Sequence, residues 1–206
     1  MLTRREVLAA AGAAALLPHA RTVLAKASQP ATQVNFSMPA GACDCHTHIH
    51  GDPAKFPFFA GRVYTPEMAL PEEMAALHRS LGIERVVIVT PSVYGTDNSA
   101  TIYGMKAFGN NARGVAVIGD KTSDAELDNL VKLDFKGVRL NLATGGVNDP
   151  GVARRQFDTV AGRIKRLNWH VQLNTNLAMV AALKDTFAAS PVPVVFDHFA
   201  NAKEEL

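Results

Sequence analysis

Three histidines, His46, His48 and His50, occupy alternate positions just before a glycine in the segment AGACDCHTHIHGD, residues 40–52. Alternate side chains of a β-strand point to the same face, so a strand through His46 and His48 would place two imidazoles side by side. Two neutral imidazoles spaced in this way can bind one divalent ion such as zinc. They could instead act only as hydrogen-bonding groups. His50 lies beyond the predicted strand, where the alternation is expected to break.

Other residues that could take part in chemistry end later β-branched segments. An arginine there can bind a carboxylate through two parallel hydrogen bonds, although Arg139 could equally form a structural ion pair. Serine and threonine hydroxyls can donate to a substrate oxygen. A histidine near the end of the chain could join the His46 and His48 pair as a third catalytic residue or metal ligand. These candidates are Ser92, Thr96, Arg139, Asn141, Asn174 and His198.

The two cysteines, Cys43 and Cys45, alternate with the histidines. Strand alternation predicts that they share the face opposite His46 and His48 and pack in an apolar environment. A disulfide between them is the alternative, although a bridge across two positions of one strand would be strained.

Six short segments have the β-branched, apolar character of strands. They read ACDCHTH (42–48), RVVIVTPS (85–92), RGVAVIG (113–119), KGVRLNL (136–142), WHVQLNT (169–175) and PVVFDHF (193–199).

Helical patterns separate these segments. Gly82 is placed to end a helix through Met74, Leu77 and Leu81. Ser123 and Glu126 form an S-x-x-E capping box before the next apolar repeat. Further helices are predicted over 98–108, 152–167 and 176–189.

Strands that alternate with helices predict a parallel α/β sheet, and the nearly continuous apolar strands agree because such sheets are buried on both faces. No glycine-rich dinucleotide fingerprint or Walker loop follows a strand, which favours a (β/α)8 TIM-barrel type over a nucleotide-binding sheet. A complete barrel typically takes about 250 residues. With about six strands, the fold is expected to be an incomplete barrel whose C-terminal units are missing.

The first 27 residues resemble a twin-arginine export signal, with Arg4 and Arg5 before an apolar run too short to span a bilayer. An ordinary secretion signal or a helix of the domain are the alternatives. Residues 28–39 are expected to be a linker and 40–206 the barrel domain. Cleavage would leave a periplasmic protein without a membrane anchor. The formal charge would change from +2 to −1. The absence of a basic stripe argues against nucleic acid and for a small-molecule substrate.

Several motifs taken together resemble the amidohydrolase-related metal-dependent hydrolases, most closely their 2-pyrone-4,6-dicarboxylate lactonase branch. The resemblance runs from about Pro39 to Phe199, and the sequence departs from that branch's tyrosine and arginine at Asn174 and Asn201. The motifs are DCHTHIHG, YTPE, VIVTPSVYGTDN, RGVAVI, GVRLN, WHVQLN and VPVVFDHF.

The resemblance implies a hydrolase that opens a lactone or cyclic ester bearing carboxylates. It implies catalytic roles for His46, His48 and His198, and contacts from Tyr64, Ser92 and Arg139 to substrate carboxylates or to the lactone carbonyl. Relatives work with zinc or without a metal, so the resemblance leaves the metal open. It also implies a general base, an aspartate at the end of an eighth strand, beyond the six strands predicted here. A metal-dependent decarboxylase on the same barrel and an inactive fragment are the alternatives.

Overall fold

The computed structural model describes residues 34–204. The predicted export signal, residues 1–27, lies outside them. Residues 34–39, the described part of the predicted linker, contain no helix or strand. Within 34–204, no helix is both long enough and apolar enough to cross a membrane.

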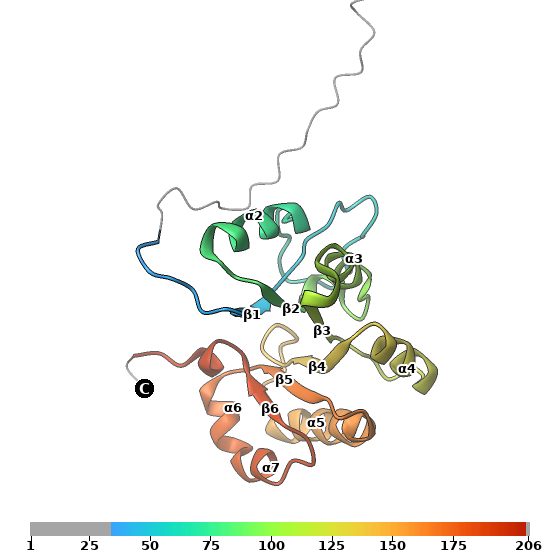
Figure 1. The fold of residues 1–206 in the computed structure, drawn as a ribbon. Coiled ribbons are helices and arrows are strands. Elements are labelled where there is room, and N and C mark those ends of the chain that lie inside the picture. The colour runs from blue at the N-terminus through green and yellow to red at the C-terminus, as the bar shows by residue number, and fades with distance from the viewer. Residues whose placement is uncertain (1–33, 205–206) are drawn as a thin grey trace, which may run out of the picture.

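One parallel sheet of six strands forms the centre of the molecule, and its strands follow chain order (Figure 1). The sheet curls into part of a barrel and does not close among the described residues, as the sequence predicts. All six predicted strands are confirmed. They are β1 (Cys43–Thr47), β2 (Arg85–Val89), β3 (Ala112–Ala116), β4 (Phe135–Asn141), β5 (His170–Asn174) and β6 (Val194–Phe196).

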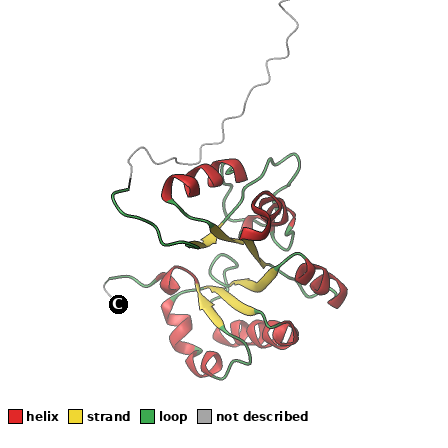
Figure 2. Cartoon of the chain, viewed as in Figure 1, coloured by secondary structure: helices red, strands yellow, loops and turns green. Residues whose placement is uncertain are grey.

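Helices cover the outer face of the curled sheet (Figure 2). The segment predicted as one helix over 176–189 is two helices, which meet at Leu183. Short 3-10 turns flank several elements, among them η1 (Ser92–Tyr94), η3 (Lys165–Leu167) and η4 (Asp197–Asn201). The α-helices are α2 (Pro71–Leu81), α3 (Ser99–Phe108), α4 (Asp124–Lys132), α5 (Pro150–Ile164), α6 (Leu177–Ala182) and α7 (Lys184–Ala188).

Both predicted helix caps are present. Gly82 ends α2 in the left-handed region at φ 73°, where a side chain would be strained, and its N–H donates to the Arg79 carbonyl. At the start of α4, the Ser123 side chain accepts from the Glu126 N–H, and the Glu126 carboxylate accepts from the Ser123 N–H in return. These caps satisfy backbone groups that a helix end leaves without partners.

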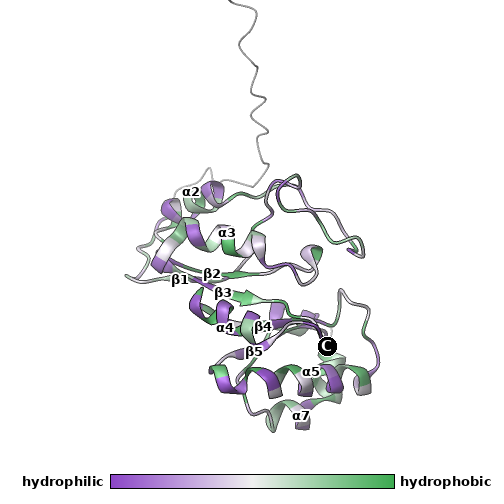
Figure 3. Ribbon diagram, turned by 90° about the vertical axis from the view of Figure 1, so that its right-hand side faces the viewer, coloured by the Kyte–Doolittle hydropathy of each residue, from purple (hydrophilic) through white to green (hydrophobic). Residues whose placement is uncertain are grey.

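The apolar core lies between the sheet and its helices, and in Figure 3 the green, hydrophobic colour is clear on β2 and β3. Helix α3 packs so closely that a Cβ added at Gly104 would lie 2.5 Å from Ile49 Cγ1 and 2.9 Å from Ile88 Cδ1. This close contact sets how near α3 can lie to β2 and to the residues just after β1.

Strand β1 contains a bulge that changes which side chains share a face. Asp44 pairs with Val86 and Thr47 with Ile88, so three residues of β1 span two of β2. Val86 and Ile88 are buried towards the helices, and Asp44 accepts a hydrogen bond from His78 of α2 at 3.1 Å.

The bulge corrects the prediction for the cysteines. Because Asp44 and Thr47 both face the helices, Cys45 and His46 share the opposite, inner face. The expectation that the cysteines lie opposite the histidines was wrong, and so was the expectation of buried packing, because Cys45 is exposed. Both thiols are free, so the disulfide alternative is absent too.

Candidate active site

A buried carboxylate, Asp197, connects three strands at one level of the inner face. Its Oδ2 accepts from Arg139 Nε and from a terminal guanidinium nitrogen, both at 2.8 Å. Its Oδ1 accepts from Gln172 Nε2 at 2.6 Å and lies 3.4 Å from His46 Nδ1. Register places Arg139 of β4 beside Gln172 of β5, so these contacts form one layer across β1, β4, β5 and the end of β6.

The ionised form of the Asp197 side chain is strongly favoured in this layer. Burial by itself would raise the pKa of the carboxyl, because it removes water from the charged form. The positive charge of Arg139 and the hydrogen bond from Gln172 outweigh burial and lower the pKa to about 2. The carboxylate is therefore ionised at neutral pH and neutralises the buried Arg139.

This layer holds His46 through Nδ1 and leaves its Nε2 without a hydrogen-bond partner among the described residues. Gln172 Nε2 lies 2.9 Å from His46 Nδ1, and because an amide nitrogen only donates, Nδ1 accepts. In neutral His46 the ring proton is then on Nε2, which is buried and has no hydrogen-bond partner among the described residues. The ring lies 5.0 Å from that of His48 and 4.9 Å from that of His198, measured between centroids.

His48 has a different environment from His46. Its Nδ1 donates to the Val89 carbonyl at 2.7 Å, which leaves Nε2 as the acceptor. Burial, with a smaller effect from the nearby charge of Arg139, lowers the pKa of His48 to about 3 against the opposing effect of the Val89 hydrogen bond. His48 is therefore neutral at pH 7.

His198 reaches the site from a turn. The predicted strand 193–199 ends at Phe196, and the chain then enters η4, in which His198 has φ 51° and ψ 39°. Non-glycine residues rarely adopt this left-handed conformation. Asn201 Nδ2 donates to the Thr175 carbonyl at 2.7 Å and ties the turn to the end of β5.

Three residues come close enough to hold one metal ion: His46, Asp197 and His198 each offer a ligand atom, and these atoms lie within 4.8 Å of one another. This set contains Asp197, whereas the sequence predicted His48 as the third member. The unpartnered Nε2 of His46 fits such an ion only with the ring proton on Nδ1, where it can donate to Asp197 Oδ1 at 3.4 Å instead of accepting from Gln172.

A second layer lies one step nearer the carboxyl ends of the strands. Asn141 and Asn174 are paired in register, two residues beyond Arg139 and Gln172, so their side chains lie above the charged layer at a rise of about 3.3 Å per residue. The Oδ1 atoms of both asparagines are buried and unpartnered among the described residues. The inner face therefore carries a charged layer below and an uncharged amide layer above.

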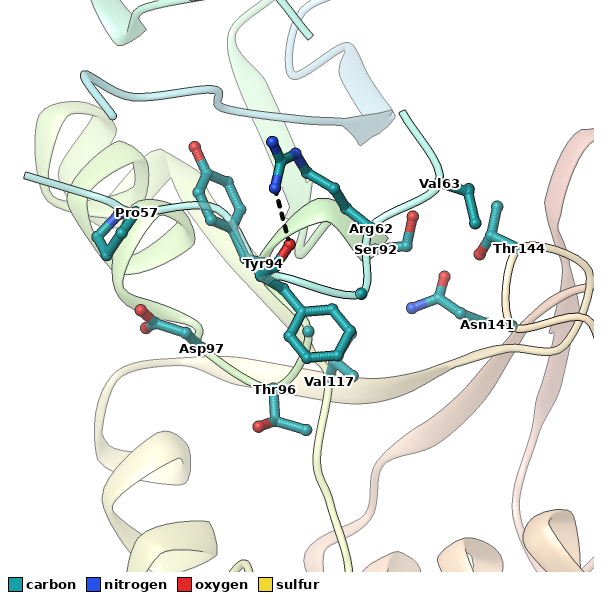
Figure 4. A pocket seen from close by; sticks show the side chains of 14 residues that line it. Pro57, Arg62, Val63, Ser92, Tyr94, Thr96, Asp97, Val117, Asn141 and Thr144 are labelled. Carbon is teal, nitrogen blue, oxygen red and sulfur yellow. Dashed lines mark hydrogen bonds between the residues drawn. The ribbon is translucent and has the colours of Figure 1, made fainter. Parts of the chain in front are cut away.

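A cavity of about 490 Å³ opens beside Asn141, at the ends of β2, β3 and β4 (Figure 4). Ser92, Thr96 and Asn141 line it, as do Phe59 and Thr144. In Figure 4 the side chains of Ser92, Asn141 and Thr144 gather on one side of the cavity. The buried Oγ1 of Thr144 has no partner among residues 34–204.

The family model for amidohydrolases matches residues 43–205, which is most of the chain. The chain belongs to the amidohydrolase family. Its relatives include proteins that are named as hydrolases and proteins whose structures have been solved.

Among the amidohydrolase relatives is a 2-pyrone-4,6-dicarboxylate hydrolase of Comamonas testosteroni, 39% identical over 81% of this chain and 54% of the relative. A 4-sulfomuconolactone hydrolase of Rhizobium radiobacter is 31% identical over 82% and 56%. A solved structure, a probable 2-pyrone-4,6-dicarboxylic acid hydrolase from Acinetobacter baumannii with citric acid bound, aligns with a TM-score of 0.68 at 26% identity, over 78% of this chain and 59% of that one. The chain spans about half the length of the curated relatives it matches.

Within this amidohydrolase fold, the structure brings most of the predicted residues to one rim. Arg139, however, binds Asp197, which is the ion-pair alternative that the sequence left open. Tyr64 is 42% exposed and does not line the cavity. The substrate contacts of both residues stay predictions.

Sequence reasoning missed Asp197 and Gln172. Each stood next to a predicted candidate: Asp197 precedes His198, and Gln172 shares a strand face with Asn174. Strand alternation could have found Gln172. The reach of Asp197 to Arg139 depends on the turn after β6, for which the sequence carries no signal.

Proposed function

We propose that this chain forms the strand-end part of the active site of a hydrolase that opens a lactone ring by adding water to its carbonyl. One observation carries the proposal: the layer around Asp197 fixes His46 with an unpartnered Nε2 beside His198. The names of the two curated relatives, which act on a pyrone dicarboxylate and a muconolactone, support a lactone that bears acidic groups.

In this proposal His46 stabilises the negative charge that develops on the carbonyl oxygen. Because Gln172 donates to Nδ1, the proton on Nε2 is available to donate to that oxygen. A donor already oriented before the reaction stabilises the transition state more than one that must first turn. His198, 4.9 Å away between ring centroids, can donate to the same oxygen from the other side.

Asp197 has a positioning role and is not the base that activates water. Its pKa of about 2 makes it a poor proton acceptor near neutral pH, and both of its oxygens already accept hydrogen bonds. It holds Arg139 and Gln172 in place, and through Gln172 it fixes the ring of His46.

A divalent ion, for which we propose zinc, is the alternative to the proton donated by His46: it would bind Nε2 of His46 with the ring proton on Nδ1, which lies 3.4 Å from Asp197 Oδ1. His46, His198 and an oxygen of Asp197 would hold it. Bound there, such an ion would polarise the lactone carbonyl. Because Asp197 already binds Arg139 and Gln172, the two histidines would be its main ligands.

We also propose that the protein is exported to the periplasm through the twin-arginine signal in residues 1–27. Replacing Arg4 and Arg5 with lysine keeps the charge and removes the motif, so the expected result is retention in the cytoplasm. Arg21→Lys is the matched control. Unchanged export of the double variant, measured by cell fractionation, would contradict the proposal.

The function is tested by incubating the full-length protein with a panel of pyrone and sugar lactones, with and without added zinc. Ring opening is followed by the loss of pyrone absorbance or by acid release. The expected result is hydrolysis of at least one acidic lactone. No turnover of any lactone by folded protein would contradict the proposal, and carbon dioxide release without ring opening would support the decarboxylase alternative.

A further inference from the structure

A second cavity, of about 350 Å³, lies between the ends of β3 and β4 and the helix α5. We call it the α5 cavity. Its volume falls within the range of about 300–1,000 Å³ that is typical of small-molecule sites. It is distinct from the cavity beside Asn141, although Val117 and Asn141 line both.

The α5 cavity opens where β3 and β4 separate. The last paired residues of the two strands are Ala116 and Val138. The next residue of the chain, Val117, has both of its backbone groups bound to the Asn98 side chain. Its N–H donates to Asn98 Oδ1 and its carbonyl accepts from Asn98 Nδ2, each at 2.9 Å. The chain after β3 therefore turns towards the start of α3 and leaves a gap beside β4.

The loop on the far side of this gap is fixed in place. Arg163 of α5 donates to the Gly119 carbonyl at 3.4 Å and to the Thr122 carbonyl. Thr122 Oγ1 in turn accepts from the Gly119 N–H at 3.0 Å. The cavity is therefore already formed before a ligand enters, which lowers the entropy lost on binding.

The floor of the α5 cavity is apolar. Ile118, Leu140 and Val160 line it, and all three pack in the main apolar core. Ile118 and Leu140 are only half-buried, because the cavity leaves one side of each uncovered. An aliphatic group placed on this floor would remove more apolar surface from water.

Two opposite charges line the same cavity. Asp120 of the loop and Arg155 of α5 are both exposed, and among residues 34–204 neither has an ion-pair or hydrogen-bond partner. They also lie too far apart to pair with each other. The third charged residue of the lining, Arg139, is neutralised by Asp197.

A zwitterion matches this pair of charges better than any other class of ligand. A carboxylate alone would attract Arg155 but would be repelled by Asp120, and an amine alone would have the opposite difficulty. An uncharged molecule would pair with neither. A molecule that carries both an ammonium and a carboxylate pairs with both side chains, and its aliphatic part can cover the floor.

We infer that the α5 cavity is a second ligand site and that it binds an aliphatic α-amino acid. The carboxylate binds Arg155, the ammonium binds Asp120, and the side chain lies on the apolar floor. The inference goes beyond the proposed function and does not depend on it.

The test is an NMR titration of the ¹⁵N-labelled full-length protein with four probes, each of which removes one part of the ligand. Leucine has all three parts. 4-Methylpentanoate lacks the ammonium, 3-methylbutylamine lacks the carboxylate, and glycine lacks the side chain. The expected result is that leucine binds about five- to tenfold more tightly than each of the other three. The shifted backbone amides should be those of residues that line the α5 cavity.

Two variants assign the charges, and both change exposed side chains. Arg155→Gln should weaken leucine binding by a similar factor and leave 3-methylbutylamine binding no weaker. Asp120→Asn should weaken leucine binding and leave 4-methylpentanoate binding no weaker. Arg154→Gln is the matched control, because Arg154 pairs with Asp158 and does not line the cavity.

Three results would overturn the inference. They are the absence of leucine binding at this cavity, equal binding of leucine and a probe that lacks one charge, and unchanged leucine binding in both Arg155→Gln and Asp120→Asn. Because binding is measured without turnover, failure to hydrolyse any lactone would contradict the proposed function and leave this inference standing.

Discussion

Asp197 determines the arrangement of the site at the scale of single residues. One buried carboxylate accepts from Arg139 and Gln172, and Gln172 in turn donates to His46. Without the carboxylate, Arg139 would be a buried cation, 5% exposed, with no counter-charge in this layer. Such a charge is expensive to keep out of water.

Replacing Asp197 with asparagine is therefore expected to lower the free energy of unfolding by about 3 kcal/mol, because it leaves Arg139 unpaired. Asp158→Asn is the control, since Asp158 forms an exposed ion pair with Arg154 on α5. Asp158→Asn is expected to lower the free energy of unfolding by less than about 1 kcal/mol. The free energies of unfolding of both variants are measured in urea. Equal losses would show that the buried pair stabilises the protein no more than the exposed pair does.

At the scale of elements, α3 packs closely against the sheet. Gly104 lies where this helix comes closest to Ile49 and Ile88, and both of those residues are fully buried. A glycine inside a helix is normally unfavourable by up to about 1 kcal/mol relative to alanine. At Gly104 the close contact should outweigh this preference.

Gly104→Ala is expected to lower stability by about 1–3 kcal/mol, because the added methyl overlaps two buried isoleucines. Gly162→Ala in α5 is the matched substitution, since a Cβ there meets nothing within 4 Å. It should raise stability by up to about 1 kcal/mol. Thermal unfolding of the two variants should show shifts of opposite sign, and shifts of the same sign would contradict the packing argument.

The capping box of α4 makes a pH-dependent contribution. The hydrogen bonds from the Ser123 N–H and hydroxyl lower the pKa of Glu126 below its usual 4.5. A lowered pKa in the folded protein means that the contribution is complete above about pH 4.5 and is lost as the pH falls through the lowered pKa.

Glu126→Gln is accordingly expected to be less stable than the parent at pH 7, and this difference should shrink as the pH falls below 4.5, as measured by urea unfolding from pH 7 downwards. Ser123→Ala should cost about 1 kcal/mol at pH 7, because it removes the side-chain acceptor of the cap. A stability difference for Glu126→Gln that does not change with pH would show that the carboxylate charge has no part in the cap.

At the scale of the whole molecule, local signals in the sequence were enough to predict the architecture. The β-branched runs marked six strands, and Gly82 and the Ser123–Glu126 pair marked helix ends, because these preferences act within a few residues. The break between α6 and α7 at Leu183 was not predicted, because the apolar pattern continues through it.

The candidate site was predictable only in part. Strand ends brought His46, Asn141 and Asn174 to one rim, as parallel strands in a barrel require. The bulge in β1 moved the cysteines to the inner face, and the turn after β6 brought Asp197 under Arg139. Both depend on pairing between distant segments, which the sequence pattern of a single strand does not encode.

The central claim is that imidazoles from the ends of β1 and β6 act together on one lactone carbonyl. It is tested most directly by kcat/KM for ring opening by the full-length protein and by its His46→Gln and His198→Gln variants. His78→Gln, on the outer face of the sheet beside Asp44, is the control. The account predicts a loss of at least about 100-fold for each site variant and almost none for the control. Activity close to that of the parent in either site variant, with folding intact, would contradict it.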